Sequence, residues 1–378
     1  MNRRTFLHAA AAVPAAMARG DTADIPKYKV VSRYAPWPKP GMPGSQPGQV
    51  VSLHSEKAID AESERVHPET LREMMSRGMR TLTGDKDPRD SWARLFNASD
   101  VVGIKVNCSG APGIMSSPEL VAEIVRNLNT VGVKPASIWI YERFKGQLDS
   151  VHYDRYVPAG VHIEAAEASR GALVGYDPGT YVEVNFFGEE DTRSNLIRLV
   201  SERFTKIINV PNMKDHGASG VTGCLKNIAY GNFSNVARSH SHEKTHTLSF
   251  IGTLASVEPL RSRTVLQVMD GLRGVWHGGP FSPNRKFRFY PKRLMLGTDP
   301  VAIDRLLIDI IEAKRKAEGA ISVWNRDPKY LANRRSNYPQ EDPNRNNFIR
   351  ETGHIEYAVR FGLGVYDVGK IQVRNIEL

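Results

Sequence analysis

The stretch "VVGIKVN" (101–107) opens the unit that decides the fold of this chain. It has the apolar composition of a buried strand, and the polar loop 108–116 follows it. "SPE" (117–119) then supplies a helix-capping serine, a first-turn proline and an acid favoured by the helix dipole. Apolar residues recur with helical spacing up to Gly132, which ends the helix, and "ASIWIYE" (136–142) is the next strand.

A strand, a helix and a second strand in this order form a βαβ unit, which requires parallel strands with a helix packed on them. The sequence therefore predicts an α/β fold with a mostly parallel or mixed sheet flanked by helices and long irregular insertions. Further strands are expected at 205–212, 264–271, 292–297 and 370–378, helices at 68–80, from 300 onward and at 353–364, and an irregular excursion at 325–349.

The N-terminal segment has the pattern of an export signal. Paired arginines at 3–4 precede a small apolar run, and Ala-Met-Ala at 16–18 offers a cleavage site. We predict a twin-arginine signal peptide over 1–18, a periplasmic or otherwise exported protein, and the twin-arginine export machinery as a partner. A proline- and glycine-rich leader is expected at 19–60 and a single α/β domain at 61–378.

The composition limits the classes of function. The 378 residues carry a net charge of +10, which favours a small anionic molecule, an anionic surface or simple solubility. No basic run is interleaved with aromatic residues, so nucleic acid is not an expected partner. No apolar run approaches the roughly 20 residues that span a bilayer, so no stable membrane span is expected.

The chain has two cysteines, Cys108 and Cys224. They are too few for a four-cysteine iron–sulfur cluster, so such a cluster is not expected in this chain. In an oxidising compartment they would form one disulfide, and otherwise they would be two small buried residues.

The stretch "KDHGASGVTGCLKN" (214–227) gathers polar groups directly after a predicted strand. In open parallel sheets, ligands bind outside the carboxyl ends of the strands. Glycines let the backbone approach a ligand, lysines attract a carboxylate or phosphate, and a histidine moves a proton or binds a metal. A structured turn with solvated lysines is the alternative. The candidates are His216, Lys226 and Lys214 as catalytic residues, and Thr222 and Asn227 as substrate-binding residues.

Two further polar residues lie in apolar surroundings. Lys105 lies inside the first predicted strand, and Asp304 lies on a partly apolar helical face, one turn beyond the expected helix cap Asp299. A carboxylate on such a face usually has a partner, for which an active-site lysine is a candidate. We therefore expect Lys105 and Asp304 to contribute to substrate binding.

The stretch "RSHSHEKTH" (238–246) contains His240, His242 and His246. In a helix, the second and third would share a face, as metal-binding pairs do. The three histidines are candidate ligands of a divalent transition metal, and a hydrophilic loop with chance histidines is the equal alternative. Proximity to His216 would strengthen the metal interpretation.

The stretch "DGLRGVWHGGP" (270–280) is expected to be either a substrate-covering loop or an ordinary long turn. The chain has neither a nucleophile elbow of the type G-x-S-x-G nor a G-x-G-x-x-G fingerprint after a strand. Serine hydrolases and classical dinucleotide-dependent dehydrogenases are therefore not favoured.

A set of segments resembles the family known as domain of unknown function 362 over about residues 100–375. Some members of that family carry a ferredoxin-like iron–sulfur segment, which this chain lacks, so no cluster is carried over from the resemblance. Many relatives look exported by the twin-arginine route. The segments are "VGIKVN" (102–107), "KDH" (214–216), "VTGCLKN" (221–227), "DGLRG" (270–274), "GTDPVAID" (297–304) and "GHIEYAVRFGLG" (353–364).

Together these features predict an exported enzyme that acts on a small anionic or carbonyl-bearing substrate, by a redox or isomerising reaction, in a crevice lined by lysine and histidine. A non-catalytic periplasmic protein that binds an anion or a metal is the main alternative. A protein whose basic surface docks an acidic partner is a third possibility.

Overall fold

The computed structural model describes residues 25–35, 41–167, 174–282, 284–333 and 341–378. The predicted signal peptide at 1–18 lies outside these residues. Within them, no helix is long and apolar enough to cross a membrane.

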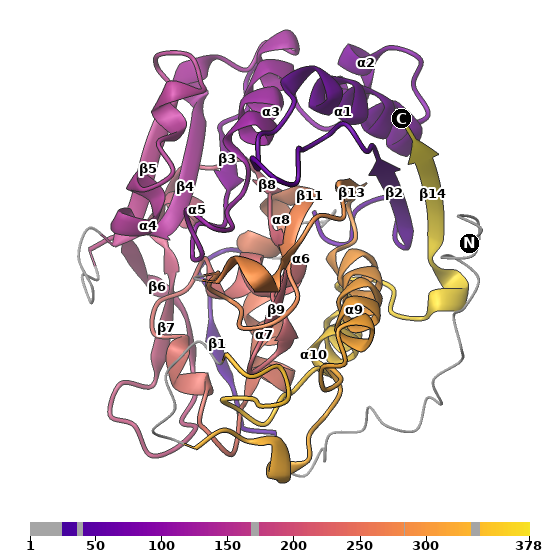
Figure 1. The fold of residues 1–378 in the computed structure, drawn as a ribbon. Helices are drawn as coiled ribbons and strands as arrows, with labels where there is room; N and C mark the ends of the chain where they lie inside the picture. Colours follow the sequence, from indigo (N-terminus) through magenta and orange to yellow (C-terminus); the bar gives the residue numbers. More distant parts are fainter. Residues whose placement is uncertain (1–24, 36–40, 168–173, 283, 334–340) are drawn as a thin grey trace.

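A large mixed sheet organises the chain (Figure 1). It contains 11 strands, and its main path runs β14-β2-β13-β11-β8-β3-β4-β5. The five strands from β11 to β5 are parallel, β13 runs antiparallel to both of its neighbours, and β14 is parallel to β2. A separate three-stranded sheet has the order β1-β6-β7. The strands are β1 (Lys29–Val31), β2 (Gln49–His54), β3 (Val102–Lys105), β4 (Ile138–Phe144), β5 (His162–Glu167), β6 (Tyr176–Glu183), β7 (Arg193–Ile197), β8 (Lys206–Asn209), β9 (Asn212–His216), β10 (Gly220–Val221), β11 (Thr264–Val275), β12 (Arg288–Phe289), β13 (Arg293–Gly297) and β14 (Gln372–Glu377).

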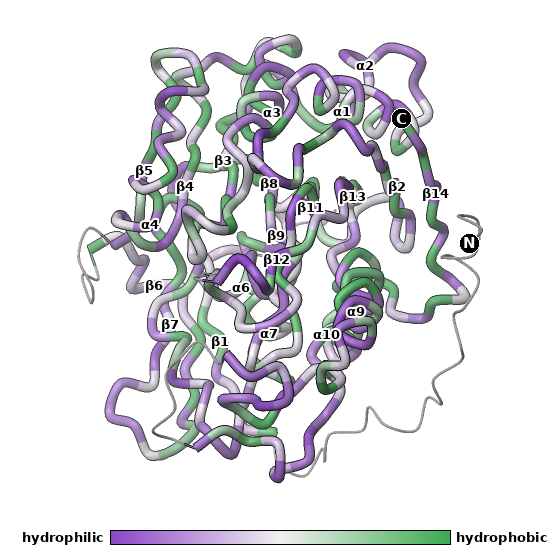
Figure 2. Tube along the Cα trace, in the orientation of Figure 1, coloured by the Kyte–Doolittle hydropathy of each residue, from purple (hydrophilic) through white to green (hydrophobic). Residues whose placement is uncertain are grey.

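Helices cover both faces of the large sheet, and each face has its own apolar core. The helices α1, α2 and α3 contribute to one core, and α6, α7, α9 and α10 contribute to the other. Figure 2 shows hydrophobic and hydrophilic residues side by side along α9, as expected of a helix with one face on the sheet. The helices are α1 (Pro68–Thr83), α2 (Pro88–Ala93), α3 (Pro118–Thr130), α4 (Lys145–Asp149), α5 (Arg198–Glu202), α6 (Gly223–Tyr230), α7 (Thr247–Ala255), α8 (Leu260–Arg263), α9 (Pro300–Ala317) and α10 (His354–Tyr357).

The α/β fold class is confirmed, and the predicted βαβ unit is present as β3, α3 and β4. The predicted helix starts are also present. The Asp299 carboxylate accepts a hydrogen bond from the amide of Ala302 at the start of α9, whereas Ser117 occupies the N-cap position of α3 without a capping hydrogen bond from its side chain. The structure differs from prediction at the leader. Residues 49–54 form β2 inside the large sheet, because their apolar side chains fill its core.

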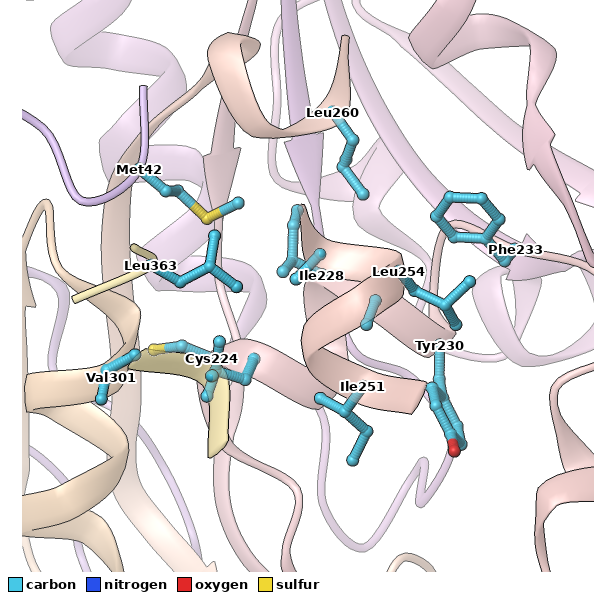
Figure 3. Close-up of a cluster of buried hydrophobic side chains, with 14 of the residues drawn as sticks. Met42, Cys224, Ile228, Tyr230, Phe233, Ile251, Leu254, Leu260, Val301 and Leu363 are labelled. Carbon is cyan, nitrogen blue, oxygen red and sulfur yellow. The ribbon is translucent and has the colours of Figure 1, made fainter. Parts of the chain in front are cut away.

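Helix α6 also differs from the sequence-based expectation, which placed residues 211–227 in a loop after a strand. The segment forms the short hairpin β9–β10 and then the helix α6, all of it buried. Figure 3 shows Cys224 and Ile228 of α6 beside Ile251 and Leu254 of α7 in the apolar cluster. Tertiary packing thus overrides the weak helix propensity of a glycine-containing sequence.

A carboxylate from α9 holds the first turn of α6. The two oxygens of Asp304 accept hydrogen bonds from the amides of Cys224, at 2.6 Å, and Leu225, at 2.8 Å. Gly223 has φ +60°, and a Cβ there would lie 2.3 Å from Oδ1 of Asp304. Only glycine fits this position without displacing the cap.

We predict that Gly223→Ala lowers the free energy of unfolding by about 2–4 kcal/mol, because it combines a left-handed backbone with a clash. Urea denaturation measures this loss. Gly319→Ala is the matched control, since Gly319 has φ +68° but no atom within 4 Å of its Cβ position. Equal losses in the two variants would contradict the capping role of Asp304.

Candidate functional site

Strand β9 and helix α6 supply the predicted catalytic residues. Lys214 and His216 alternate along β9 and lie on the same side of the strand, with Asp215 on the other. Lys226 lies on α6, which follows the hairpin and packs against β9. Burial lowers the pKa of His216, and the charges of both lysines lower it further, so the three residues lie near one another.

Lys226 is buried without an acidic partner. Lys226 is 8% exposed, and its Nζ has neither a hydrogen bond nor an ion pair among the residues that the structure describes. The Nζ lies 4.5 Å from the ring centroid of Tyr230, one helical turn along α6. Burial lowers its pKa to about 7, and the charges of Lys214 and Arg143 act in the same direction. At neutral pH, Lys226 is therefore partly a neutral amine.

Lys214 is fully buried, and its contacts are neutral. Its Nζ donates to Oδ1 of Asn107 at 2.7 Å and to Oγ of Ser109 at 2.8 Å. Burial lowers its pKa to about 7. Both oxygens accept hydrogen bonds from Nζ, but neither carries a negative charge.

A chain of buried amides holds Lys214 in place. Asn107 donates to Asn227, Asn227 donates to Asn209, and Asn209 donates to Gln267, at distances of 2.7–2.9 Å. Each of the three asparagines uses its oxygen to accept and its nitrogen to donate, and Gln267 ends the chain as an acceptor, so the orientation of each amide is fixed. Asn227 therefore supports the site from within the core.

His216 presents an N–H group. Its Nδ1 accepts hydrogen bonds from the amides of Ala218, at 3.1 Å, and Ser219, at 3.3 Å. Because an accepting nitrogen carries no proton, Nε2 carries the proton of the neutral ring. Burial and the nearby positive charges hold the pKa of His216 well below its ordinary value. This histidine is thus a neutral donor, and its Nε2 lone pair is not available to a metal.

His240 complements His216 with a lone pair. The two ring centroids lie 5.3 Å apart. Nδ1 of His240 lies 3.1 Å from the carbonyl oxygen of Ala237, to which it donates, so Nε2 is an acceptor. That Nε2 is buried and has no hydrogen-bond partner among the described residues. Burial, together with the charge of Lys226, lowers the pKa of His240 to about 3.

His354, in α10, is a residue that sequence reasoning did not select. Both of its ring nitrogens are buried and lack hydrogen-bond partners within the described part of the chain. Burial lowers its pKa to about 3, and the charge of Lys226 contributes. The signal available in the sequence was its position in the C-terminal segment shared with the resembling family.

The other two predicted metal ligands lie apart. His242 is hydrogen-bonded through Nδ1 to the carbonyl of Asn347, and His246 stacks on Phe186 with a centroid distance of 4.8 Å. The helix that would align them is absent, because α7 begins only at Thr247. Among the described residues, no group of three or more His, Cys, Asp or Glu side chains is placed to hold a metal ion.

Three predicted substrate-binding residues have different surroundings. Lys105 pairs with Glu142 at 2.8 Å and donates to the carbonyl of Val106, so it is an internal ion pair. Asp304 caps α6 with both oxygens. Thr222 precedes α6, and its buried hydroxyl has no hydrogen-bond partner among the described residues. Only Thr222 of these three retains polar capacity for a ligand.

The two cysteines are free and buried. Burial raises the pKa of both thiols, so they remain protonated. The first part of the stretch 270–280 is not a loop, because β11 continues to Val275, and only residues 276–280 form a turn. His277, Gly278 and Gly279 follow it and line a small pocket.

We predict that Lys226→Met raises the free energy of unfolding at neutral pH, by roughly 1–4 kcal/mol. Lys226 has a folded pKa of about 7 and an ordinary value of 10.5. Between these values the unfolded chain binds a proton that the folded chain does not, so stability rises with pH in this window. Below pH 7, Lys226 is protonated in both the folded and the unfolded chain, so the free-energy cost of burying its charge no longer changes with pH. Denaturation at pH values from 6 to 10.5 measures how steeply the free energy of unfolding rises with pH. We expect the Lys226→Met variant to lack this rise.

Lys134→Met is the control for this experiment, because Lys134 is exposed on the surface. It should leave the dependence of stability on pH unchanged. Lower stability of Lys226→Met across the whole range would show that the lysine holds the fold together.

The strands and the helix that carry the site lie within a region shared with other proteins. A family model described as "Domain of unknown function (DUF362)" matches residues 102–309, more than half of the chain. The match includes β9 and α6, but it ends before His354. No curated protein matches the chain. The resemblance predicted from the sequence is confirmed, and the chain belongs to the DUF362 family.

Proposed function

We propose that this protein is an enzyme that acts on a small anionic or carbonyl-bearing substrate at Lys226. The observation that carries this proposal is the buried Lys226 amine, which has no acid beside it in the described part of the chain. Burying an unpaired cation is costly, and folded proteins rarely retain one without a functional reason. A negatively charged guest would supply the missing partner.

The surroundings of Lys226 favour a negative charge. The two charges that shift its pKa besides burial are those of Lys214 and Arg143, and both are positive. Arg143 is itself paired with Glu167, at 3.0 Å. An anionic group entering this region would gain charge-assisted hydrogen bonds in surroundings of low dielectric constant.

The groups around Lys226 fit proton transfer beside a carbonyl. In its neutral form, Lys226 takes a proton from the carbon next to the carbonyl group, and the electron pair of that C–H bond forms a C–C double bond. The carbonyl oxygen then becomes negative and accepts a hydrogen bond from Nε2–H of His216. In a substrate with a hydroxyl group on the carbon that lost its proton, the hydroxyl proton passes to the negative oxygen, so that the first carbon becomes the new carbonyl carbon. Lys226 then returns the proton it took to the former carbonyl carbon, which completes an isomerisation.

The remaining residues have supporting roles in this proposal. Lys214 and the Thr222 hydroxyl bind the anionic group, and the lone pair of His240 accepts a hydrogen bond from a substrate hydroxyl. Asn227 connects Asn107 to Asn209 in the chain of hydrogen-bonded amides. These roles use the orientation of each donor and acceptor described above.

We also propose that the protein works outside the cytoplasm. The paired arginines at 3–4 and the Ala-Met-Ala site at 16–18 support export by the twin-arginine machinery. That route carries folded proteins, so the buried site would form before export.

The test is deuterium exchange at the carbon beside the carbonyl group. Small 2-oxo and 2-hydroxy acids are incubated with the protein in D₂O, and proton NMR measures the loss of C–H signal. We expect at least one acid to exchange about a hundredfold faster than in buffer, because a positioned base contributes 10²–10⁴-fold. Lys226→Met should abolish this exchange.

Lys226→Arg is the matched control, since arginine keeps the charge but remains protonated at neutral pH. It should bind the acid and fail to exchange it. Exchange that persists in either variant would contradict the role of Lys226 as base. Tight binding of an acid to wild type without any exchange would support the non-catalytic anion-binding alternative.

A further inference from the structure

The end of β4 carries a guanidinium group that uses only one of its three nitrogens. Arg143 is the next-to-last residue of β4, and its side chain is 14% exposed. Its Nε lies 3.0 Å from Oε1 of Glu167 and 3.0 Å from the hydroxyl oxygen of Tyr176. NH1 and NH2 have neither a hydrogen bond nor an ion pair among the described residues. These two nitrogens are therefore free to bind a ligand that arrives from solvent.

The neighbours of Arg143 fix the direction in which NH1 and NH2 point. Oε1 of Glu167 accepts from Nε of Arg143 and also from the Tyr176 hydroxyl, so the three side chains form one hydrogen-bonded group. The central carbon of the guanidinium group lies 4.6 Å from the ring centroid of Phe144. Because the guanidinium group is planar, holding Nε and one face also orients the other two nitrogens. A receptor oriented in advance loses little side-chain freedom when a ligand binds.

Arg143 faces the end of α6 at which the amine of Lys226 lies. Tyr141 and Arg143 alternate along β4, so they lie on the same side of the strand. The Tyr141 hydroxyl donates to Oδ1 of Asn232 at 3.0 Å, two residues after the end of α6. The Nζ of Lys226 lies over the ring of Tyr230, the last residue of α6. Burial lowers the pKa of Lys226, and the charge of Arg143 lowers it further, which agrees with this placement.

We propose that Arg143 binds the carboxylate group of the substrate through NH1 and NH2, and that it selects 2-oxo and 2-hydroxy acids over neutral carbonyl compounds. A guanidinium group offers two parallel N–H bonds, which match the two oxygens of a carboxylate. The inference rests on the function proposed above, because it places the substrate beside Lys226. It narrows that function, since it assigns the anionic group of the substrate and adds β4 to the elements that hold it.

Calorimetry tests binding separately from reaction. Oxamate is the first probe, because it has the shape and charge of pyruvate but no C–H bond to exchange, and oxamide is its uncharged counterpart. We expect one oxamate to bind per chain, and oxamide to bind about tenfold more weakly or worse, since it cannot form a charge-assisted pair. Arg143→Lys should weaken oxamate binding about tenfold, because an ammonium group keeps the charge but lacks the two parallel N–H bonds.

Two more variants keep the binding test decisive. Arg77→Lys is the matched control, because Nε of Arg77 also pairs with a glutamate, Glu73, but on the exposed surface of α1. It should leave oxamate binding unchanged. Phe144→Leu replaces Arg143→Lys if that variant does not fold, since it removes the ring beneath the guanidinium group without changing a charge. It should weaken oxamate binding severalfold.

The exchange assay distinguishes a failure of this inference from a failure of the proposed function. For pyruvate, Arg143→Lys should raise KM about tenfold and change kcat much less, because Arg143 binds the acid and does not transfer the proton. An unchanged KM in Arg143→Lys, with exchange intact in wild type, would overturn the role of Arg143 and leave Lys226 as the base. Oxamate binding that depends on Arg143, without exchange of any acid, would support the carboxylate site and contradict the proposed reaction. Absence of oxamate binding to wild type at millimolar concentrations would overturn this inference, as would unchanged binding in the folded variants of Arg143 or Phe144.

Discussion

The burial of positive charge at the ends of the strands is the constraint on which this site depends. Lys226 and Lys214 lie inside the protein, and neither is in direct contact with a carboxylate among the described residues. Such groups either lose their protons or acquire an anionic partner. Both responses are chemically useful, because a neutral amine is a base and a charged one is an anion receptor. The neutral histidines beside Lys226 add a donor and an acceptor without adding charge.

The fold creates this constraint by bringing distant segments to one strand. β9 alternates its side chains, so Lys214 and His216 meet α6 on one side and Asp215 meets Arg350 on the other. Helix α6 keeps its place because Asp304 caps it and its apolar residues pack against α7 (Figure 3). The core on that side of the sheet therefore holds in place the helix that carries Lys226.

The sequence predicted the parts of the molecule that local patterns determine. The βαβ unit follows from apolar spacing and the cap at Asp299 from capping chemistry, and both act over a few residues. Helix α6 was missed because its sequence is glycine-containing and polar, and only burial stabilises it. The sequence made Lys214, His216 and Lys226 candidate site residues because they lie close together in the chain. His354 joins from more than a hundred residues away, and no local pattern encodes its position near Lys226.

The most direct test of the central claim is the pKa of Lys226 in the folded protein. Heteronuclear NMR of protein labelled in its lysine side chains follows each ammonium group through a pH titration, and the signal absent from the Lys226→Met spectrum identifies the residue. The structure predicts a midpoint of about 7 for this lysine. A midpoint near the ordinary value of 10.5 would mean that water or an acid offsets the cost of burying the charge of Lys226. That result would contradict this account.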